Sequence, residues 1–275
     1  MAQRNKFVKP RSRRIATARV VAGKQISPNF VRVTIAGDEL GSVTPMGYDQ
    51  WFRMFIPQPG QTVLRLPSTS SNLWFAQLKL MAKDTRPIAR SYTIRDYRAA
   101  GAGSFGDTTE IDIDFASHGD PGPASAWAHI ASPGDPVAVL DEGLIYNPTP
   151  GAEWQLLVGD ESALPAIAGI LHSSPADLRA EVFIEVADAD DAQEISVGED
   201  VNVHWLVRED AAAKPGALAL DTVLGADLPA GPSYTFVAGE SALPTALRRH
   251  LVNERHVPKS DIAFTGYWRH GHAAY

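Results

Sequence analysis

Short runs of alternating apolar and polar residues, separated by turns containing glycine and proline, characterise the first half of the chain. Such runs predict β-strands, because alternate side chains of a strand point to opposite faces. They lie at residues 16–21, 30–35, 51–56, 61–66, 89–95 and 109–115, and a closing strand follows at 137–140. Six short strands with one helix after the last fit a small antiparallel barrel.

The pattern changes after residues 146–151, a stretch with two prolines and a glycine that we interpret as a linker. Strands are predicted at 154–158, 181–186, 201–207, 234–238 and 262–267, with helices at 163–172 and 242–255. Alternating strands and helices indicate a parallel sheet covered by helices. The predicted fold class is therefore β plus α/β. A basic flexible leader (1–14) precedes an antiparallel six-stranded barrel domain (15–147), an α/β domain (148–265) and a C-terminal tail (266–275).

Residues 67–88 lack strand alternation and form an insertion in the barrel pattern. Their apolar side chains have the loose spacing of a short amphipathic helix, at Leu73, Trp74, Phe75, Leu78, Leu80 and Met81. A small satellite core is the favoured interpretation. A flap over a ligand pocket is the alternative.

The composition narrows the chemistry that this chain can perform. Its 275 residues include no cysteine, which excludes disulfides, iron–sulfur clusters and thiol catalysis, so any redox chemistry needs a bound cofactor. A formal net charge of -7 argues against nucleic-acid binding. The basic leader lacks the apolar stretch of a secretory signal, and no apolar run approaches the ~20 residues that span a bilayer. We therefore expect a cytoplasmic protein without membrane insertion.

One candidate binding motif lies in residues 114–128. A predicted strand ends at Asp114 and Phe115, and an apolar run begins at Ala126 after a turn rich in glycine and proline. Ser125 precedes that run, in the position of a helix N-cap. Free backbone N–H groups and the positive end of a helix suit a phosphate. Taken alone, a capped helix after a loop is the simpler explanation.

A second motif, Arg90-Ser91-Tyr92-Thr93, lies on a predicted strand upstream. Arg90 and Tyr92 share one face of that strand, and Thr93 lies on the other. An arginine fork can pair with phosphate oxygens, a tyrosine can lie against a conjugated ring, and a threonine hydroxyl can bond polar ring atoms. An edge strand with solvated arginines is the alternative.

Two similar turns occur in the second half, at residues 158–165 and 237–244, which read VGDESALP and VAGESALP. Both stand where a predicted strand ends and a helix begins. They predict two turns at the carboxyl edge of one sheet, which is where open α/β sheets bind ligands. Pro165 fits the first helical turn and Ser162 can cap it. A well-capped helix explains these residues equally well.

In combination these motifs resemble a known family. The pairing of Arg-x-Tyr-Ser/Thr with Gly-x-x-Ser, and the turn from Gly159 to Pro165, are similar to motifs of ferredoxin-reductase-like flavoproteins. The fuller pattern resembles the siderophore-interacting proteins, which are FAD-dependent ferric-siderophore reductases. It consists of His118-Gly119, then Gly122-Pro123-Ala124-Ser125 and Trp127, and the ending Gly266-Tyr267-Trp268-Arg269. The resemblance extends from about residue 15 to residue 271.

The resemblance implies that the barrel holds FAD and the α/β domain receives NADPH or NADH, with the tail folding back towards the flavin. Hydride would pass to the flavin, and single electrons to Fe(III) of a ferric siderophore, which releases Fe(II). Tyr92 and Thr93 would contact the isoalloxazine as catalytic residues, and Arg90 and Ser125 would hold the pyrophosphate. The implied cofactor-binding set is Arg90, Ser91, Tyr92, Thr93, Asp114, Phe115, His118, Gly122, Pro123, Ala124, Ser125, Trp127, Gly159, Asp160, Glu161, Ala163, Leu164, Tyr267, Trp268 and Arg269.

The choice between NADH and NADPH is left open by the sequence. Acids such as those of residues 188–191 can bind ribose hydroxyls when they follow the second strand of a dinucleotide site, whereas a basic group favours a 2′-phosphate. Arg208 is the nearest basic candidate. A solvated acidic loop is the simpler interpretation of residues 188–191, and the common Gly-x-Gly-x-x-Gly fingerprint is absent.

The substrate end departs from the family pattern. Arg53 stands where members commonly carry lysine, and acids expected after Arg269 are missing. Arg53 and Arg65 are candidate contacts for an anionic siderophore, and no metal site is expected at His270 and His272. One alternative function is an NAD(P)H-flavin oxidoreductase that delivers electrons to a ferredoxin or other protein. Another is a non-enzymatic siderophore- or nucleotide-binding module. The sequence does not indicate the oligomeric state.

Overall fold

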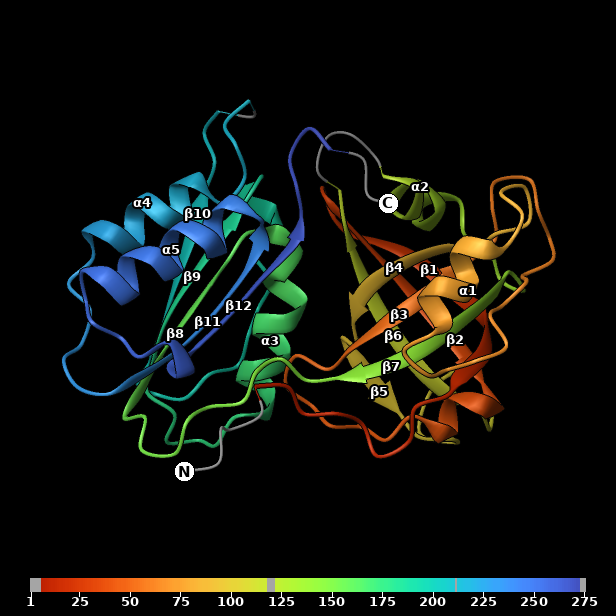
Figure 1. Cartoon of the computed structure of the whole chain (residues 1–275), viewed down its shortest axis with the longest axis horizontal. Helices are drawn as coiled ribbons and strands as arrows, with labels where there is room; N and C mark the ends of the chain where they lie inside the picture. The colour runs from red at the N-terminus through yellow and green to blue at the C-terminus, as the bar shows by residue number, and fades with distance from the viewer. Residues whose placement is uncertain (1–5, 118–121, 211, 273–275) are drawn as a thin grey trace. The chain divides into compact units, whose positions relative to one another are not determined.

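The computed structural model describes residues 6–117, 122–210 and 212–272. The chain folds into two compact units (Figure 1). One consists of Lys9–Met46 and Gln50–Leu144. The other consists of the N-terminal residues up to Val8, the short segment Gly47–Asp49, and the chain from Ile145 onward.

The first unit is an antiparallel sheet with strand order β4-β3-β7-β1-β2-β6-β5. Its strands are β1 (Ile15–Ser27), β2 (Phe30–Gly37), β3 (Trp51–Ile56), β4 (Ile88–Thr93), β5 (Asp96–Arg98), β6 (Thr109–Ala116) and β7 (Pro136–Gly143). The edge strands β4 and β5 are separated by only Ile94 and Arg95. The sheet must therefore curl until its two edges meet, which closes a barrel. If β4 and β5 count as one bent strand, the barrel has six strands, the predicted number, but the closing strand β7 stands in place of the strand predicted at residues 61–66.

Two parts of the strand prediction for the barrel are wrong. Residues 61–66 are not a strand, and Leu64 and Leu66 pack instead against a small apolar cluster outside the barrel. The strand predicted at residues 16–21 is longer than expected, because β1 continues to Ser27 and pairs with β2 up to Phe30.

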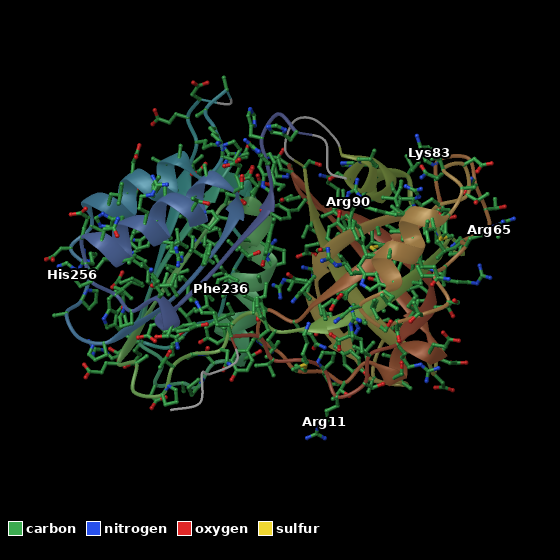
Figure 2. The ribbon with its side chains drawn as sticks, in the orientation of Figure 1. Arg11, Arg65, Lys83, Arg90, Phe236 and His256 are labelled. Atoms are coloured by element: carbon green, nitrogen blue, oxygen red, sulfur yellow. The ribbon has the colours of Figure 1, made fainter. Side chains whose placement is uncertain are left out.

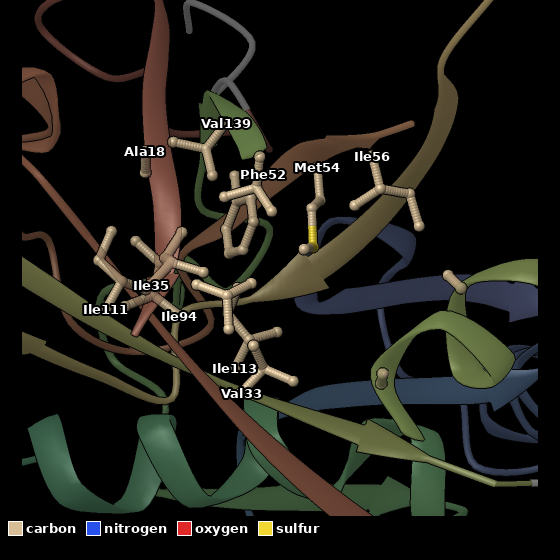
Figure 3. Close-up of a cluster of buried hydrophobic side chains, with 14 of the residues drawn as sticks. Ala18, Val33, Ile35, Phe52, Met54, Ile56, Ile94, Ile111, Ile113 and Val139 are labelled. Carbon is tan, nitrogen blue, oxygen red and sulfur yellow. The ribbon is translucent and has the colours of Figure 1, made fainter. Parts of the chain in front are cut away.

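The barrel core comes from alternate residues of each strand, as the period of a strand requires. Phe52, Met54 and Ile56 of β3 point inward, as do Ile111 and Ile113 of β6, and all five are at most 1% exposed. Figure 3 shows these side chains gathered around the barrel axis with residues of β1, β2 and β7. Each buried side chain of this size stabilises the fold by about 1.5–3 kcal/mol relative to an exposed one.

The insertion contains one helix, α1 (Trp74–Leu80). Trp74 and Leu78 pack with Phe55, Ala138 and Leu140, which lie on the outer face of β3 and β7. The Trp74 ring meets Phe55 edge-to-face at 5.6 Å between centroids. This confirms the satellite-core interpretation for these two residues. A second helix, α2 (Pro123–Ile130), follows β6, and a 3₁₀ turn (Asp38–Ser42) follows β2.

The second unit is a parallel sheet with strand order β10-β9-β8-β11-β12. Its strands are β8 (Trp154–Gly159), β9 (Ala180–Val186), β10 (Val201–Val207), β11 (Ser233–Glu240) and β12 (Ile262–Trp268). Helices α4 (Ala217–Gly225) and α5 (Ala242–Asn253) lie on one face and α3 (Leu164–Ser173) on the other (Figure 1). Short 3₁₀ turns occur at Glu161–Ala163, Ala189–Asp191 and Lys259–Asp261.

This arrangement confirms the predicted α/β class, and the sequence pattern missed only α4 among its helices. The core between the sheet and the helices α4 and α5 includes Leu156, Val158, Val223, Leu247 and Leu251. No helix among the described residues combines the length and the apolar character needed to cross a membrane.

Candidate functional site

Helix α2 begins earlier than the sequence pattern predicts. Pro123 is its first residue, Gly122 is the N-cap, and no side chain caps the helix. The predicted N-cap role of Ser125 is wrong, because Pro123 already has the backbone angle of a first helical residue. The Ser125 hydroxyl instead donates to the Ala116 carbonyl at 3.2 Å. The first intrahelical bond runs from the Ala126 N–H to the Gly122 carbonyl, so the N–H groups of Ala124 and Ser125 have no acceptor within the helix.

Arg90 lies on β4, the strand that packs against α2 (Figure 2). Its guanidinium is half-buried and donates through Nη1 to the Ala89 carbonyl at 2.8 Å. Burial lowers the pKa of the Arg90 guanidinium from its ordinary value, while the nearby Tyr92 side chain acts in the opposite direction. Burial also raises the pKa of the Tyr92 hydroxyl, which therefore stays protonated at neutral pH. A cation is thus held beside a neutral phenol at this end of the barrel.

Three aromatic rings connect β4, β6 and α2. The centroid of Tyr92 lies 4.3 Å from that of Phe115, and Phe115 lies 5.9 Å from Trp127. Phe115 is 1% exposed, so it is a core residue that supports its neighbours. Tyr92 and Trp127 are only partly buried and pack at the margin of the barrel core. The structure therefore brings the strand of Arg90 and the helix that follows Gly122 together.

Asp114 is already engaged by two arginines. Its carboxylate accepts bonds from Nε and Nη2 of Arg32 at 2.6 and 2.8 Å, and Nε of Arg95 lies 3.4 Å away. It belongs to a row of acids along β6, in which Glu110 and Asp112 both bind Arg98. Its side chain is fully buried, so this carboxylate cannot contact a ligand directly and can act only by positioning Arg32 and Arg95.

The remaining predicted barrel residues have mixed positions. Thr93 is buried and lies on the opposite side of β4 from Tyr92. Ser91 is exposed, and its hydroxyl accepts a bond from Arg53. Gly122 and Pro123 are exposed at the start of α2, whereas Ala124 is buried. His118 lies outside the described residues.

The turn after β8 has little room for side chains. A Cβ on Gly159 would lie 2.5 Å from the Cβ of Ala163, so only glycine lets the end of β8 lie this close to the turn that follows it. The residues that follow, Asp160, Glu161, Ala163 and Leu164, are fully buried, so a ligand here meets backbone rather than these side chains. The predicted cap by Ser162 is wrong. Asp160 is the acceptor, and it takes the N–H of Ser162 at 2.9 Å.

The turns after β8 and β11 lie side by side, because these strands are neighbours in the sheet. This confirms that the two similar sequences form turns at one carboxyl edge. Gly239 has φ +135°, and a Cβ there would lie 2.6 Å from Asp160 Oδ2, which itself accepts the N–H of Glu240. The chain order reverses between β8 and β11. Such a switch point forms the crevice in which open α/β sheets bind nucleotides.

Buried charges behind this edge were not foreseen from the sequence. Arg208 binds both oxygens of Glu161 at 2.6 and 2.7 Å and Oε1 of Glu185 at 2.7 Å. Glu185 also accepts the N–H groups of Gly216 and Ala219 at the start of α4, each at 2.9 Å. Burial opposes the charge of Arg208, but its two carboxylate partners raise its pKa overall.

The C-terminal aromatics lie beside the second turn. Tyr267 and Trp268 form the end of β12, so the strand runs further than predicted, and the Trp268 carbonyl accepts the N–H of Ser241 at 3.0 Å. Glu240 accepts the N–H of His270 at 3.2 Å. Arg269 is exposed. No group of three or more His, Asp or Glu within the described ranges could hold a metal ion.

The two candidate substrate residues differ in their surroundings. Arg65 is exposed and points away from the barrel (Figure 2). Arg53 lies over the Trp51 ring at 4.9 Å and 3.9 Å from Glu142. Glu142 also binds Arg13 at 2.6 Å, so this part of the predicted flexible leader is held against the barrel.

Two family models match the chain. The model described as siderophore-interacting FAD-binding domain matches residues 19–144, and the model described as siderophore-interacting protein matches residues 152–271. The chain belongs to the siderophore-interacting protein family. This membership confirms the family resemblance noted from the sequence, just as the two sheets confirm the predicted fold class.

Relatives of this siderophore-interacting protein align with it along nearly the whole chain. The ferric vibriobactin reductase ViuB of Vibrio cholerae is 32% identical over 257 residues, covering 91% of this chain and 88% of that protein. The crystal structure of a siderophore utilization protein from T. fusca is 30% identical with a TM-score of 0.81, covering 98% and 97% of the two chains. A ferredoxin reductase of carbazole 1,9a-dioxygenase, at 15% identity and a TM-score of 0.58, shares the fold.

The barrel of this family member suits a flavin that carries a diphosphate. The start of α2 has no side-chain cap, and a Cβ at Gly122 would meet no atom of the described residues within 4 Å. Arg90 adds a half-buried guanidinium on the adjacent strand, and Tyr92 adds a partly exposed ring. This region thus offers backbone N–H groups and a guanidinium for a diphosphate, and an aromatic ring for a flavin.

Proposed function

We propose that this protein is a flavin-dependent reductase that passes electrons from NAD(P)H through FAD to Fe(III) in a ferric siderophore and releases Fe(II). The match of residues 19–144 to a siderophore-interacting FAD-binding domain carries the proposal. The similarity to a protein named ferric vibriobactin reductase supports the iron chemistry. The absence of cysteine means that the chain has no thiol of its own for the redox step.

In the barrel, Arg90 and the uncapped N–H groups of α2 hold the pyrophosphate of FAD. A helix start and a guanidinium both stabilise such an anion. Tyr92 lies against the isoalloxazine, and Phe115 behind it fixes the orientation of its ring. When bound, FAD supplies the exchange between the two-electron donor and the one-electron acceptor. Ser91, Thr93, Asp114 and His118 complete the proposed barrel site, with Asp114 acting through Arg32 and Arg95.

The α/β unit receives the nicotinamide nucleotide at the switch point between β8 and β11. The tight turn at Gly159 and the left-handed Gly239 let the backbone approach a ligand closely. Tyr267 and Trp268 lie next to this turn and provide aromatic surface for the cofactors. The proposed domains are residues 15–147 for FAD and 148–265 for NAD(P)H, with the tail as part of the cofactor site.

The ferric siderophore is proposed to meet Arg53. This guanidinium is flanked by Trp51 and Trp74, which can cover the apolar parts of a chelate. Burial lowers the pKa of Arg53, although Glu142 acts in the opposite direction, so its charge is poorly solvated and suited to an anionic partner. Arg65 is a second proposed contact.

A direct test is an anaerobic titration of purified protein with NADH or NADPH, in the presence of a ferric siderophore and an Fe(II)-specific chelator. We expect a yellow protein whose flavin absorbance falls on addition of the nucleotide, together with coloured Fe(II)–chelator complex. Protein freed of flavin is the control and should give no Fe(II). Flavin bleaching without Fe(II) would instead support an oxidoreductase that serves a ferredoxin or other protein. Colourless protein that takes up no FAD would support a binding module.

A further inference from the structure

The carboxylate of Glu142, near the end of β7, lies between two guanidinium groups of the barrel unit. Its side chain is only 7% exposed. Arg13 binds it with two nitrogens, since Nη2 lies 2.6 Å from Oε1 and Nε lies 3.2 Å from Oε2. Nε of Arg53 lies 3.9 Å from Oε1, which is beyond hydrogen-bond distance. Glu142 is therefore paired with Arg13, although Arg53 is close by.

The guanidinium of Arg13 is itself held in place. Its Nη1 donates to the carbonyl of Ser70 in the insertion, so each of its nitrogens has a partner within the barrel unit. Its side chain is 19% exposed. A group engaged in this way has little to offer a ligand directly. It can still affect a ligand through the carboxylate that it binds.

Arg53 has fewer partners than Arg13. Among the described residues its hydrogen bond is to the Ser91 hydroxyl, and its buried Nε has no hydrogen-bond partner. The side chain is 35% exposed, and the guanidinium lies over the rings of Trp51 and Trp74 at 4.9 and 5.7 Å. A small turn of this side chain towards Glu142 would satisfy the buried Nε. The guanidinium would then be less available to a substrate.

The buried carboxylate needs a cation, because an unpaired buried charge is costly. Lys9 lies 3.8 Å away, too far for a hydrogen bond, and its side chain is 61% exposed. Without Arg13, the better-placed partner for Glu142 is thus Arg53. Burial and the charge of Arg13 lower the pKa of Arg53, whereas Glu142 raises it. The three groups therefore interact electrostatically, and a close pair of Arg53 with Glu142 would be neutral.

This contact joins two differently matched parts of the chain. Arg53 and Glu142 lie within residues 19–144, which match the model of the siderophore-interacting FAD-binding domain. Arg13 precedes that range, in the basic leader predicted from the sequence. The surroundings of the candidate substrate residue thus depend on a side chain outside the matched family pattern.

We propose that Arg13 is a positioning residue of the siderophore site, which occupies Glu142 and so keeps Arg53 available to an anionic ferric siderophore. The inference rests on the proposed function, because it requires Arg53 to meet the substrate. It adds a residue of the leader that determines which chelates bind. A multiply anionic chelate, such as a ferric tris-catecholate, gains from an accessible guanidinium, whereas a neutral ferric tris-hydroxamate does not.

A double-mutant cycle separates positioning from direct contact. The FAD-loaded, oxidised protein is titrated by calorimetry, without nucleotide, with a hexadentate ferric tris-catecholate and with a ferric tris-hydroxamate. Arg13→Ala should weaken binding of the tris-catecholate by about tenfold and change binding of the tris-hydroxamate by less than about twofold. When Glu142→Gln is already present, Arg13→Ala should have little effect on either chelate, because no carboxylate then draws Arg53 away.

Arg14→Ala is the matched control for the loss of charge. Arg14 is the next residue in the chain, it is exposed, and its charge acts on Glu39. This variant should bind both chelates as the wild type does. A loss of tris-catecholate binding as large as that of Arg13→Ala would show an effect of net charge and would overturn the inference.

The remaining outcomes separate the inference from the function on which it rests. If Arg13→Ala weakened tris-catecholate binding equally with Glu or Gln at position 142, Arg13 would act on the chelate itself and not through Glu142. Unchanged binding in Arg13→Ala, or equal loss of both chelates, would also overturn the positioning role. If the wild type bound neither chelate, the siderophore part of the proposed function would fail and the inference with it.

Discussion

Arg90 is the side chain on which the proposed FAD site depends most. Arg90→Ala removes a charge-assisted contact to the pyrophosphate, which we expect to weaken FAD binding by about 1.5–3 kcal/mol. The measurement is the dissociation constant of FAD, from fluorescence quenching as flavin-free protein is titrated. Arg11→Ala is a matched control, because Arg11 is exposed and points away from the same unit (Figure 2). Equal FAD affinity in both variants would remove Arg90 from the site.

Residue contacts could be predicted where they depend on one strand, and not where they depend on a partner strand. The shared face of Arg90 and Tyr92 follows from the period of β4 alone. The engagement of Asp114 depends on its register with Arg32 across β2 and β6, which no local pattern reveals. The same holds for Ser125, whose hydroxyl found a carbonyl at the end of β6 rather than capping its own helix.

At the scale of elements, α1 is held in place by its two buried residues, Trp74 and Leu78. Trp74 is 7% exposed against Phe55, whereas Leu73 is 68% exposed. Trp74→Ala should therefore lower the free energy of unfolding by about 3–5 kcal/mol through lost burial and a cavity. Leu73→Ala, one position away, should change it by less than about 0.5 kcal/mol. Urea unfolding measures both, and a Trp74→Ala protein as stable as the wild type would show that this small core does not hold α1.

Arg208 connects the turn after β8 to the strand β9 and the start of α4. Arg208→Met leaves Glu161 and Glu185 as buried, uncompensated carboxylates, which should cost about 3–5 kcal/mol of unfolding free energy. Adding Glu161→Gln to this variant should restore part of the loss, because one of the two charges is then removed. Arg249→Met on α5 is the control, since Arg249 is exposed. A single variant as stable as the wild type would show that the carboxylates are neutralised in another way.

The elements that the sequence pattern missed depend on tertiary contacts. Helix α4 lacks a side-chain cap, and its first N–H groups are satisfied by Glu185 from β9, so no local start signal precedes it. Residues 61–66 have strand-like alternation but no neighbouring strand to pair with, and their apolar side chains join the cluster around Trp74. The parallel sheet could be predicted because each of its buried strands is marked by its own apolar run.

At the scale of the whole molecule, a short segment from the barrel sequence belongs to the α/β unit. Residues Gly47–Asp49 pack against α3, where Tyr48 donates its N–H to Ser173 Oγ at 2.7 Å. Asp49 is 1% exposed and accepts the N–H groups of Ile145 and Tyr146 at 3.0–3.1 Å. This acid therefore holds the chain at the point where it enters the second unit, and nothing in the local sequence marks it.

Asp49 should give the protein a stability that falls as the pH rises. Burial raises the pKa of Asp49 from 3.8 to about 7, although the hydrogen bonds from Tyr146 and Ile145 act in the opposite direction. Between these two values the folded protein holds a proton that the unfolded chain releases. Its contribution is thus fully present below pH 3.8 and is lost as the pH rises through about 7, with a slope of at most about 1.4 kcal/mol per pH unit.

Asp49→Asn removes this titration while it keeps an oxygen that can accept the backbone N–H groups. In urea unfolding between pH 5 and about 8, the stability of the wild type relative to Asp49→Asn should fall as the pH rises and level off above the pKa. Asp221→Asn, at an exposed position on α4, should run parallel to the wild type. If the wild type gained stability over Asp49→Asn with rising pH, the charged carboxylate would be the form that holds Ile145 and Tyr146. The hydrogen bonds would then outweigh the burial of the acid.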